Sequence, residues 1–411
     1  MKKRLVVLVA TLTAVLTVSL PGALAGATAE PGLTATSIKI GTTMPLSGPA
    51  SLYAPIATGM RAYFSHINAR KAAGDGKRGV YGRQILLKVE DDGYNPVQTA
   101  QQTRKLVEQD KVFALVGGLG TEQQLAVRAY LNQKKVPQIY VSTGASTWGR
   151  DHKANPWTIG WQPDYVSEGI AYAKWLKANR PNAKVAVLFQ NDDYGKDYLQ
   201  GFRSQFGRSI VAQQSYETGA ASVASQTAAL RASGADTFLI LAIPQPTIQA
   251  LVVAYRLGWR PTLIVNSVSA TDTFLGLAQN AAGSAEAVNG IVTTAYLKDV
   301  AAAKYANDKQ VKFYKALMKK YAPSANANNG LYYYGMAKAA DFVQALFRAG
   351  KNPTRASLMR AVVNLSYKSP WLIPGSQVNT SAANAFPIKF QRLTRFNNGS
   401  FSEFGPLQKI R

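Results

Sequence analysis

Cysteine is absent from the 411 residues, and histidine occurs only twice, as His66 and His152. Without a thiol the chain can form no disulfide, no thiolate metal site and no cysteine nucleophile, and it has no cysteine that a lipid could modify. Long apolar runs are also missing after residue 25, so the rest of the chain is expected to have no stable membrane anchor.

Acidic side chains are scarce, with 22 Asp and Glu against 47 Lys and Arg, which gives a formal net charge of +25. A basic surface of this kind can serve nucleic acid, anionic lipid or an anionic ligand. The Lys and Arg residues are scattered singly and form no basic tract. We therefore expect no nucleic-acid partner.

The N-terminal segment has the pattern of a secretory signal. Lys2, Lys3 and Arg4 precede an apolar run over residues 5–20, and small residues surround Ala25 and Ala29. We predict a signal peptide over 1–25, with an alternative end at 29, and a mature protein in the periplasm or secreted. The alternative is a membrane anchor, but the run is diluted by threonines and is shorter than the roughly 20 residues that span a bilayer.

From residue 37 short apolar runs alternate with longer amphipathic segments, which is typical of βα units around a parallel sheet. The length favours two domains over one. The predicted strands lie at 38–43, 85–90, 112–117 and 136–141 and, in a second set, at 185–189, 210–214, 238–242 and 263–266. Residues 150–163 are predicted to form a crossing between two lobes. Later residues predict a strand at 291–294, helices at 309–321 and 331–349, surface loops at 322–330 and 370–375, and a strand within 387–396.

Three loops that follow predicted strands are candidates for ligand contact, because ligands of open α/β sheets bind beyond the carboxyl ends of the strands. The first, 45–53, ends in Tyr53; it could equally be an ordinary turn. The second contains Gly120 and Thr121, and Thr121 with Gln124 has the spacing of a helix-capping box. The third contains Gly144, Ala145 and Ser146, small residues that would let a ligand touch the backbone.

The residues give little support for catalysis, a metal site or a cofactor. Ser142 is a conceivable nucleophile, but no Gly-x-Ser-x-Gly turn surrounds it, and His66 falls in a predicted helix. The adjacent acidic pairs Asp91-Asp92 and Asp192-Asp193 lack a histidine at ligand spacing and are expected to act as turn and cap carboxylates. We expect no catalytic residues, no metal and no cofactor.

Several segments in order resemble the leucine/isoleucine/valine-binding family of type I periplasmic solute receptors of ABC transporters. They are Ile38-Lys39-Ile40-Gly41, 45–49, Glu90-Asp91-Asp92, Asn95-Pro96, Val116-Gly117-Gly118, 142–146 and Asn191-Asp192-Asp193-Tyr194-Gly195. The resemblance implies an α/β fold of two Rossmann-like lobes with parallel sheets joined by a three-segment hinge. Lobe 1 would comprise 37–160 and 293–369, and lobe 2 would comprise 161–292 and 370–411.

The same resemblance implies a monomer that closes on a small solute and delivers it to an ABC transporter permease. By position, Tyr53 would form an aromatic wall, Thr121 with Gly120 would hold a carboxylate, and Gly144, Ala145 and Ser146 would make backbone and hydroxyl contacts. Tyr194 and Ser267 would face them from lobe 2.

One departure from the family concerns the loop at 265–269. Members that bind amino acids have there an acidic side chain for the ligand's ammonium, whereas this chain has Ser267, and the nearest carboxylate is Asp272. A desolvated ammonium needs a partner. A carboxylic acid, an amide or a neutral solute therefore stays open beside a branched-chain amino acid. A sensor that presents its closed form to a receptor, and an exported hydrolase, are the alternative functions.

Overall fold

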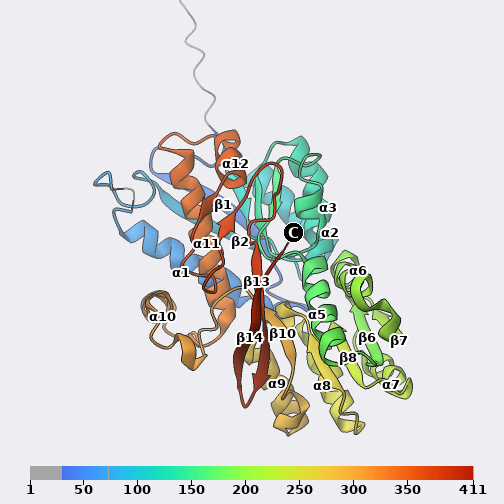
Figure 1. The fold of residues 1–411 in the computed structure, drawn as a ribbon. Helices are drawn as coiled ribbons and strands as arrows, with labels where there is room; N and C mark the ends of the chain where they lie inside the picture. The colour runs from blue at the N-terminus through green and yellow to red at the C-terminus, as the bar shows by residue number, and fades with distance from the viewer. Residues whose placement is uncertain (1–29, 73, 411) are drawn as a thin grey trace, which may run out of the picture.

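The computed structural model describes residues 30–72 and 74–410, and two sheets organise it (Figure 1). The first sheet has five parallel strands in the order β2-β1-β3-β4-β5. Their bounds are β1 Ser37–Met44, β2 Gln84–Asp91, β3 Ala114–Val116, β4 Gln138–Val141 and β5 Thr158–Gly160. This sheet forms the centre of the first lobe.

The second sheet has seven strands in the order β14-β13-β10-β9-β8-β6-β7 and forms the centre of the second lobe. Strands β6 to β10 are parallel, whereas β13 is antiparallel to both of its neighbours. The bounds are β6 Val185–Gln190, β7 Ile210–Tyr216, β8 Thr237–Leu241, β9 Thr262–Val265, β10 Val292–Ala295, β13 Phe390–Asn397 and β14 Ser400–Lys409. A small antiparallel pair, β11 Ser366–Tyr367 with β12 Val378–Asn379, lies apart from both sheets.

Helices cover both faces of each sheet. Side chains alternate along the strands, so successive residues of one strand pack on opposite faces of the sheet. On β3, Ala114 and Val116 face the main core while Leu115 packs in a separate cluster with Leu131. The helices of the first lobe are α1 Pro55–Ala69, α2 Pro96–Arg104, α3 Thr121–Gln133, α4 Thr147–Arg150, α10 Lys309–Tyr321, α11 Gly330–Ala349 and α12 Arg355–Val363. The pairs α1 with α11 and α2 with α3 are in contact.

In the second lobe, Val185 and Val187 of β6 point to one core and Ala186 and Leu188 point to the other. Helices α5 Tyr165–Asn179 and α6 Asp193–Phe206 cover the first of these faces. Helices α7 Ala224–Ala232, α8 Pro244–Arg256 and α9 Asp272–Ala282 cover the second. The central strand β6 is therefore buried on both sides, as is typical of parallel sheets.

Glycines bring two helix pairs into unusually close contact. A Cβ placed on Gly169 would lie 2.2 Å from the Tyr198 carbonyl oxygen, and one on Gly201 would lie 2.0 Å from the Val166 carbonyl oxygen, so α5 and α6 cross backbone to backbone. Gly59 and Gly335 do the same where α1 crosses α11. The two crossings fix one helix pair in each lobe.

The chain passes between the lobes three times. It leaves β5 for α5, returns from β10 to α10 and α11, and finally runs from β12 to β13.

The predicted strands of both sets, the strand at 291–294 and the two later helices are confirmed, whereas the predicted lobe boundaries stay a prediction. The predicted signal peptide lies outside the described residues. Among residues 30–72 and 74–410, no helix has the length and apolar character needed to cross a bilayer.

Two local predictions are wrong. Residues 150–163 do not form only a crossing, because they contain β5, which pairs with β4 through Gln138 and Val141. Residues 370–375 are not a surface loop, since Trp371, Leu372 and Ile373 are buried in the core. Aromatic contacts with Tyr63 and Tyr333 hold the Trp371 ring there.

Candidate binding site between the lobes

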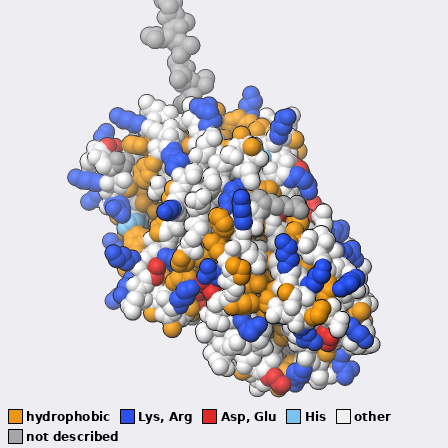
Figure 2. Space-filling view, viewed as in Figure 1, with side chains coloured by type: hydrophobic (Ala, Val, Ile, Leu, Met, Phe, Trp, Pro, Cys, Tyr) orange, Lys and Arg blue, Asp and Glu red, His pale blue; other side chains and the backbone are white. Residues whose placement is uncertain are grey.

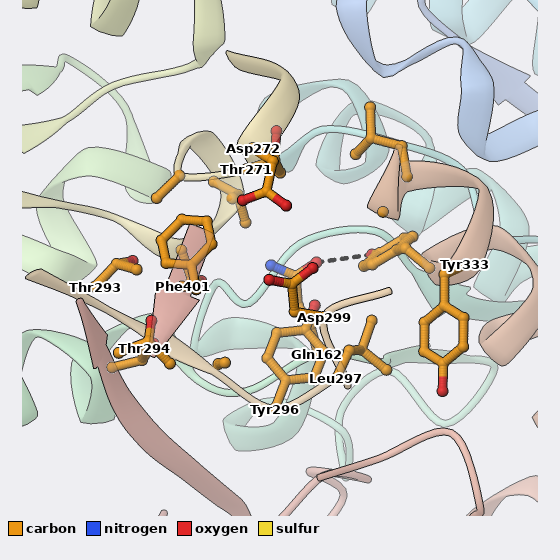
Figure 3. Close-up of a pocket in the computed structure, with 18 of the residues that line it drawn as sticks. Gln162, Thr271, Asp272, Thr293, Thr294, Tyr296, Leu297, Asp299, Tyr333 and Phe401 are labelled. Atoms are coloured by element: carbon orange, nitrogen blue, oxygen red, sulfur yellow. Dashed lines mark hydrogen bonds between the residues drawn. The ribbon is translucent and has the colours of Figure 1, made fainter. Parts of the chain in front are cut away.

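A cavity of about 440 Å³ lies between the lobes, at the carboxyl ends of both sheets. Loops after β1, β3 and β4 line it from the first lobe, and loops after β9 and β10 line it from the second. Figure 3 shows how Tyr296, Leu297 and Phe401 point into it between polar side chains. Its size is within the range of about 300–1,000 Å³ that holds organic ligands.

Thr121 and Thr143 form the polar part of the first-lobe wall. Their hydroxyl oxygens are 2.6 Å apart, and Thr143 Oγ1 also accepts a hydrogen bond of 3.1 Å from the Ala145 N–H. Gly120 precedes α3 with a φ of +102°, a conformation that glycine adopts without strain, and lines the same wall. The N–H groups of the first turn of α3 have no partner within the helix, so this wall suits an anion.

The predicted capping box at this helix is wrong. Thr121 is the first residue of α3 and its hydroxyl bonds to Thr143, so it does not cap the helix. The Gln124 side chain instead donates to Thr43 Oγ1 at 2.8 Å. The Thr121 hydroxyl is thereby held at the cavity.

Ser142, beside Thr143, is in contact with a buried lysine. Its Oγ donates to the Gly117 carbonyl oxygen at 2.8 Å and accepts a hydrogen bond from Nζ of Lys338, on α11. Lys338 is fully buried, and burial lowers the pKa of its ammonium well below the usual value. No carboxylate of the described residues forms an ion pair with it, and the lowered pKa favours the neutral amine, so Lys338 acts here as a hydrogen-bond donor to Ser142 Oγ and the Gly117 carbonyl oxygen.

Tyr53 and Tyr194 both line the cavity, and their predicted ligand contacts stay a prediction. The Tyr53 hydroxyl donates to the Val268 carbonyl oxygen in the other lobe at 3.1 Å, and its ring lies edge-on to Phe274. Tyr194 accepts a hydrogen bond from Asn266 and packs edge-on against Tyr165. Burial raises the pKa of both phenols far above the usual value, so they stay neutral.

Ser267 also lines the cavity, and the carboxylate of Glu168 lies behind it. Glu168, on α5, is 1% exposed and accepts four hydrogen bonds: from Ser267 N at 2.7 Å, Ser267 Oγ at 2.8 Å, Tyr172 at 2.5 Å and Tyr198 at 3.2 Å. Burial raises the pKa of this carboxyl and the hydrogen bonds oppose that rise. Four donors to two oxygens match an ionised carboxylate.

Asp272 and Asp299 bring two more carboxyl groups to the second-lobe side, where Figure 3 shows them pointing toward one another. Burial raises the pKa of the Asp272 carboxyl to about 8, and the negative charge of Asp299 adds to the rise. Burial also raises the pKa of Asp299, whose Oδ1 accepts from the Ala301 N–H at 2.9 Å. The sequence offered Asp272 only as the nearest carboxylate, and Asp299 was missed.

Gly144, Ala145 and Ser146 lie beside the cavity and do not line it. The Gly144 carbonyl accepts from the Tyr165 N–H at 2.8 Å. Ser146 donates through its N–H to Asp197 Oδ2 at 2.6 Å and through its Oγ to Asp197 Oδ1 at 3.2 Å, which joins α4 to α6 across the lobes. The predicted ligand contacts of these three residues stay a prediction.

The acidic pairs act as turn and cap groups, as predicted. Asp91 accepts from the N–H groups of Leu46, Ser47 and Gly93, and Asp192 caps α6 through the Gly195 N–H. Among the described residues no group of three or more acidic or histidine side chains could hold a metal ion.

Comparison with known proteins shows which protein family this chain matches. Residues 37–399 match the family model described as periplasmic binding protein. A Brucella abortus protein called Leu/Ile/Val-binding protein homolog 7 is 25% identical over 240 residues, which cover 56% of this chain and 58% of that relative. The match therefore spans little more than half of that relative's length.

Two solved structures share the fold. One is a branched-chain amino acid ABC transporter protein from Thermus thermophilus with bound valine, with a TM-score of 0.78 and 17% identity, covering 92% of this chain and 97% of that one. The other is a fatty acid ABC transporter substrate-binding protein from Thermomonospora curvata, with a TM-score of 0.76 and 20% identity, covering 92% and 94%.

Proposed function

We propose that this chain, which belongs to the periplasmic binding protein family, captures a carboxylate-bearing organic solute between its lobes and delivers it to an ABC importer. The observation that carries the proposal is the Thr121–Thr143 hydroxyl pair at the start of α3, inside a cavity that both lobes line. Hydroxyl donors and helix N–H groups in this position match a carboxylate.

The electrostatics of the first-lobe wall favour the anionic group of a ligand at this end of the cavity. The positive end of α3 faces the region of Ser142 and Thr143. Lys338 has no acidic partner among the described residues, so a carboxylate bound nearby would favour its protonated form. The strongly basic surface adds a weaker long-range attraction for anions.

Hydrogen bonds between the lobes support hinge closure as the mechanism. Tyr53 bonds to the Val268 carbonyl, Ser146 bonds to Asp197, and the Asp193 N–H donates to Glu122 at 3.4 Å. A solute that contacts Thr121 on one side and Ser267 on the other would add to these bonds and shift the population toward the closed form.

The cavity leaves room for several kinds of carboxylate. The Thermus structure is described with bound valine and the Thermomonospora protein as a fatty acid binder, so this fold serves ligands of different length. Branched-chain amino acids and related carboxylates or amides are the solute class we propose. We also propose that the protein acts outside the cytoplasm after cleavage at Ala25 or Ala29.

A thermal-shift screen of the mature chain tests the proposal. The library contains amino acids, aliphatic and aromatic acids, amides and amines. A solute at 100 times its Kd stabilises the folded state by about 2.7 kcal/mol, which shows as a clear rise in Tm. No response to any member of the library would contradict solute binding. For the importer role, the hit should stimulate ATP hydrolysis by the permease complex in liposomes only when this protein is present.

A further inference from the structure

Acidic residues are unevenly distributed along this chain. Between residues 31 and 89 the only Asp or Glu is Asp75, and between residues 309 and 402 the only one is Asp341. Asp341 is buried, so it adds no negative charge to the surface. Lys and Arg occur throughout both segments, which therefore supply most of the net positive charge of the chain.

The fold brings these two segments together in the first lobe. They contain α1, α10, α11 and α12, and α1 contacts both α10 and α11 while α11 contacts α12. In Figure 1 the four helices lie on one side of the lobe, away from α2 and α3. We call their surface the basic face. Its exposed cations, with those just after α1 and α11, are Arg61, Arg70, Lys71, Lys312, Lys319, Lys320, Arg348, Lys351 and Arg360.

Positive charges come close to one another where α1 meets α10. Arg70 Nη1 lies 3.1 Å from His66 Nε2, and the His66 ring is edge-on to Phe313 of α10. Burial lowers the pKa of His66, and the positive charges of Arg70 and Lys320 lower it further. Both cations therefore act on one imidazole ring. Figure 2 shows Lys and Arg side chains along the edge of the molecule where α1 and α10 lie in Figure 1.

The cations of the basic face lack acidic partners. Among residues 30–72 and 74–410, every ion pair involves a Lys or Arg outside this set. Like charges gathered without counter-charges repel one another, and an anionic partner relieves that repulsion. The basic face is thus complementary in charge to an extended anionic surface.

The distribution of apolar residues favours a lipid surface over a protein partner. Protein interfaces are usually centred on aromatic or other apolar side chains that become buried. The large apolar side chains exposed in the described part of the chain are Leu46, Leu86, Val97, Val211, Leu257 and Leu277, and none lies on the four helices. Lys and Arg spread over several helices match mobile lipid headgroups, because the headgroups can move to meet each charge.

We propose that the basic face binds this protein reversibly to a membrane of anionic phospholipid, with the first lobe toward the lipid. The attraction is electrostatic and needs no inserted segment. It goes beyond the proposed function and does not depend on a solute in the cavity. Because salt screens exposed charges over about 10 Å at 0.1 M ionic strength, added salt should release the protein.

The test is co-sedimentation of the mature chain with vesicles of phosphatidylcholine alone or mixed with phosphatidylglycerol. One variant carries Lys312→Glu, Lys319→Glu and Lys320→Glu, which reverse three charges of the basic face on α10. The matched control carries Lys174→Glu, Lys177→Glu and Lys196→Glu, which reverse three exposed lysines on α5 and α6 and give the same net charge. Unfolding curves establish that both variants are folded.

Wild type and control should bind the mixed vesicles at low salt and leave the phosphatidylcholine vesicles free. The α10 variant should bind the mixed vesicles about tenfold or more weakly. If wild type does not bind the mixed vesicles, or if both variants lose affinity equally, the inference is overturned. Binding of a DNA duplex in place of the mixed vesicles would also overturn it. Solute binding is measured separately, so each of these results leaves the proposed function standing.

Discussion

The Ser267 hydroxyl donates a hydrogen bond of 2.8 Å to a carboxylate oxygen of Glu168, which lies 99 residues earlier in the chain. Ser267 is at the cavity, and Glu168 is buried behind it on α5. The carboxylate thus fixes the direction of the serine proton and places a negative charge one residue away from the ligand. It also ties α5 to the loop after β9.

Replacing Glu168 with glutamine should destabilise the protein. The amide group of glutamine is a donor, so it would face hydroxyl and N–H donors that now point to a carboxylate oxygen. We expect the free energy of unfolding to fall by about 1–3 kcal/mol, measured by chemical denaturation. Glu217→Gln, at an exposed side chain, is the control and should change it by less than about 0.5 kcal/mol. Equal stability of Glu168→Gln and wild type would refute the role of this carboxylate.

Gly201→Ala should separate α5 from α6. The new methyl group would lie 2.0 Å from the Val166 carbonyl oxygen, so the helices must move apart. We expect a loss of about 1–3 kcal/mol in the free energy of unfolding. Gly276→Ala, in α9 where nothing lies within 4 Å of the new methyl, should instead stabilise the protein by about 0.5–1 kcal/mol. The same sign for both variants would contradict the close crossing.

Asp197→Ala should loosen the closed form. The substitution removes both hydrogen bonds that Ser146 makes across the lobes. We expect weaker solute binding, by about three- to thirtyfold, because one to two hydrogen bonds that favour closure are lost. Asp193→Ala, which changes an exposed carboxylate of the same helix, is the control. Unchanged affinity in Asp197→Ala would show that these bonds do not contribute to closure.

Stability should fall as the pH rises from about 5 to 8. Burial raises the pKa of Asp92, Asp192 and Asp197 to about 6, of Asp341 to about 7 and of Asp272 to about 8, all above the value of about 3.9 in an unfolded chain. Each of these carboxyls therefore keeps its proton to a higher pH in the folded state than in the unfolded state, and its stabilising contribution is lost as that proton leaves. Tm measured across the range should decline.

Asp272→Asn tests how much of that decline comes from the cavity. The charges that act on the pair are the two carboxyls themselves and Lys315 of α10, while Lys298 and Lys304 of the cavity are paired with Asp308 and Glu403. The variant should show a flatter Tm profile between about pH 6 and 8 and a higher Tm at pH 8 than wild type. An identical profile would mean that Asp272 does not titrate in this range.

Local patterns predicted most of the fold because buried strands and helices carry their periodicity in neighbouring residues. Helix α10 at Lys309–Tyr321 matches its predicted bounds. Strand β5 was missed because it has only three residues and follows a segment rich in turn-forming residues. Strand β14 was missed because it lies at the sheet edge, where its residues are largely exposed and polar.

The residues of the candidate site also fall into two groups, those whose location the sequence could indicate and those whose location it could not. The location of Tyr53, Thr121 and Ser267 at the cavity could be predicted because they follow strands, where the fold brings loops together. Glu168 and Lys338 could not, since they sit on helices and meet Ser267 and Ser142 at separations of 99 and 196 residues. A weak signal existed for Glu168: it shares a helix face with Tyr165, Tyr172 and Leu176, an apolar stripe where an acid is out of place.

The most direct test of solute binding between the lobes is calorimetric titration of a thermal-shift hit into wild type, Thr121→Val and Ala295→Trp. Thr121→Val removes a hydroxyl from the carboxylate end, and Ala295→Trp fills part of the cavity. Thr36→Val, at an exposed threonine, is the control. We predict one site per chain in wild type and control, an affinity lower by about 1–3 kcal/mol in Thr121→Val, and no measurable binding in Ala295→Trp. Equal affinity in all four proteins would place the solute elsewhere and contradict the account.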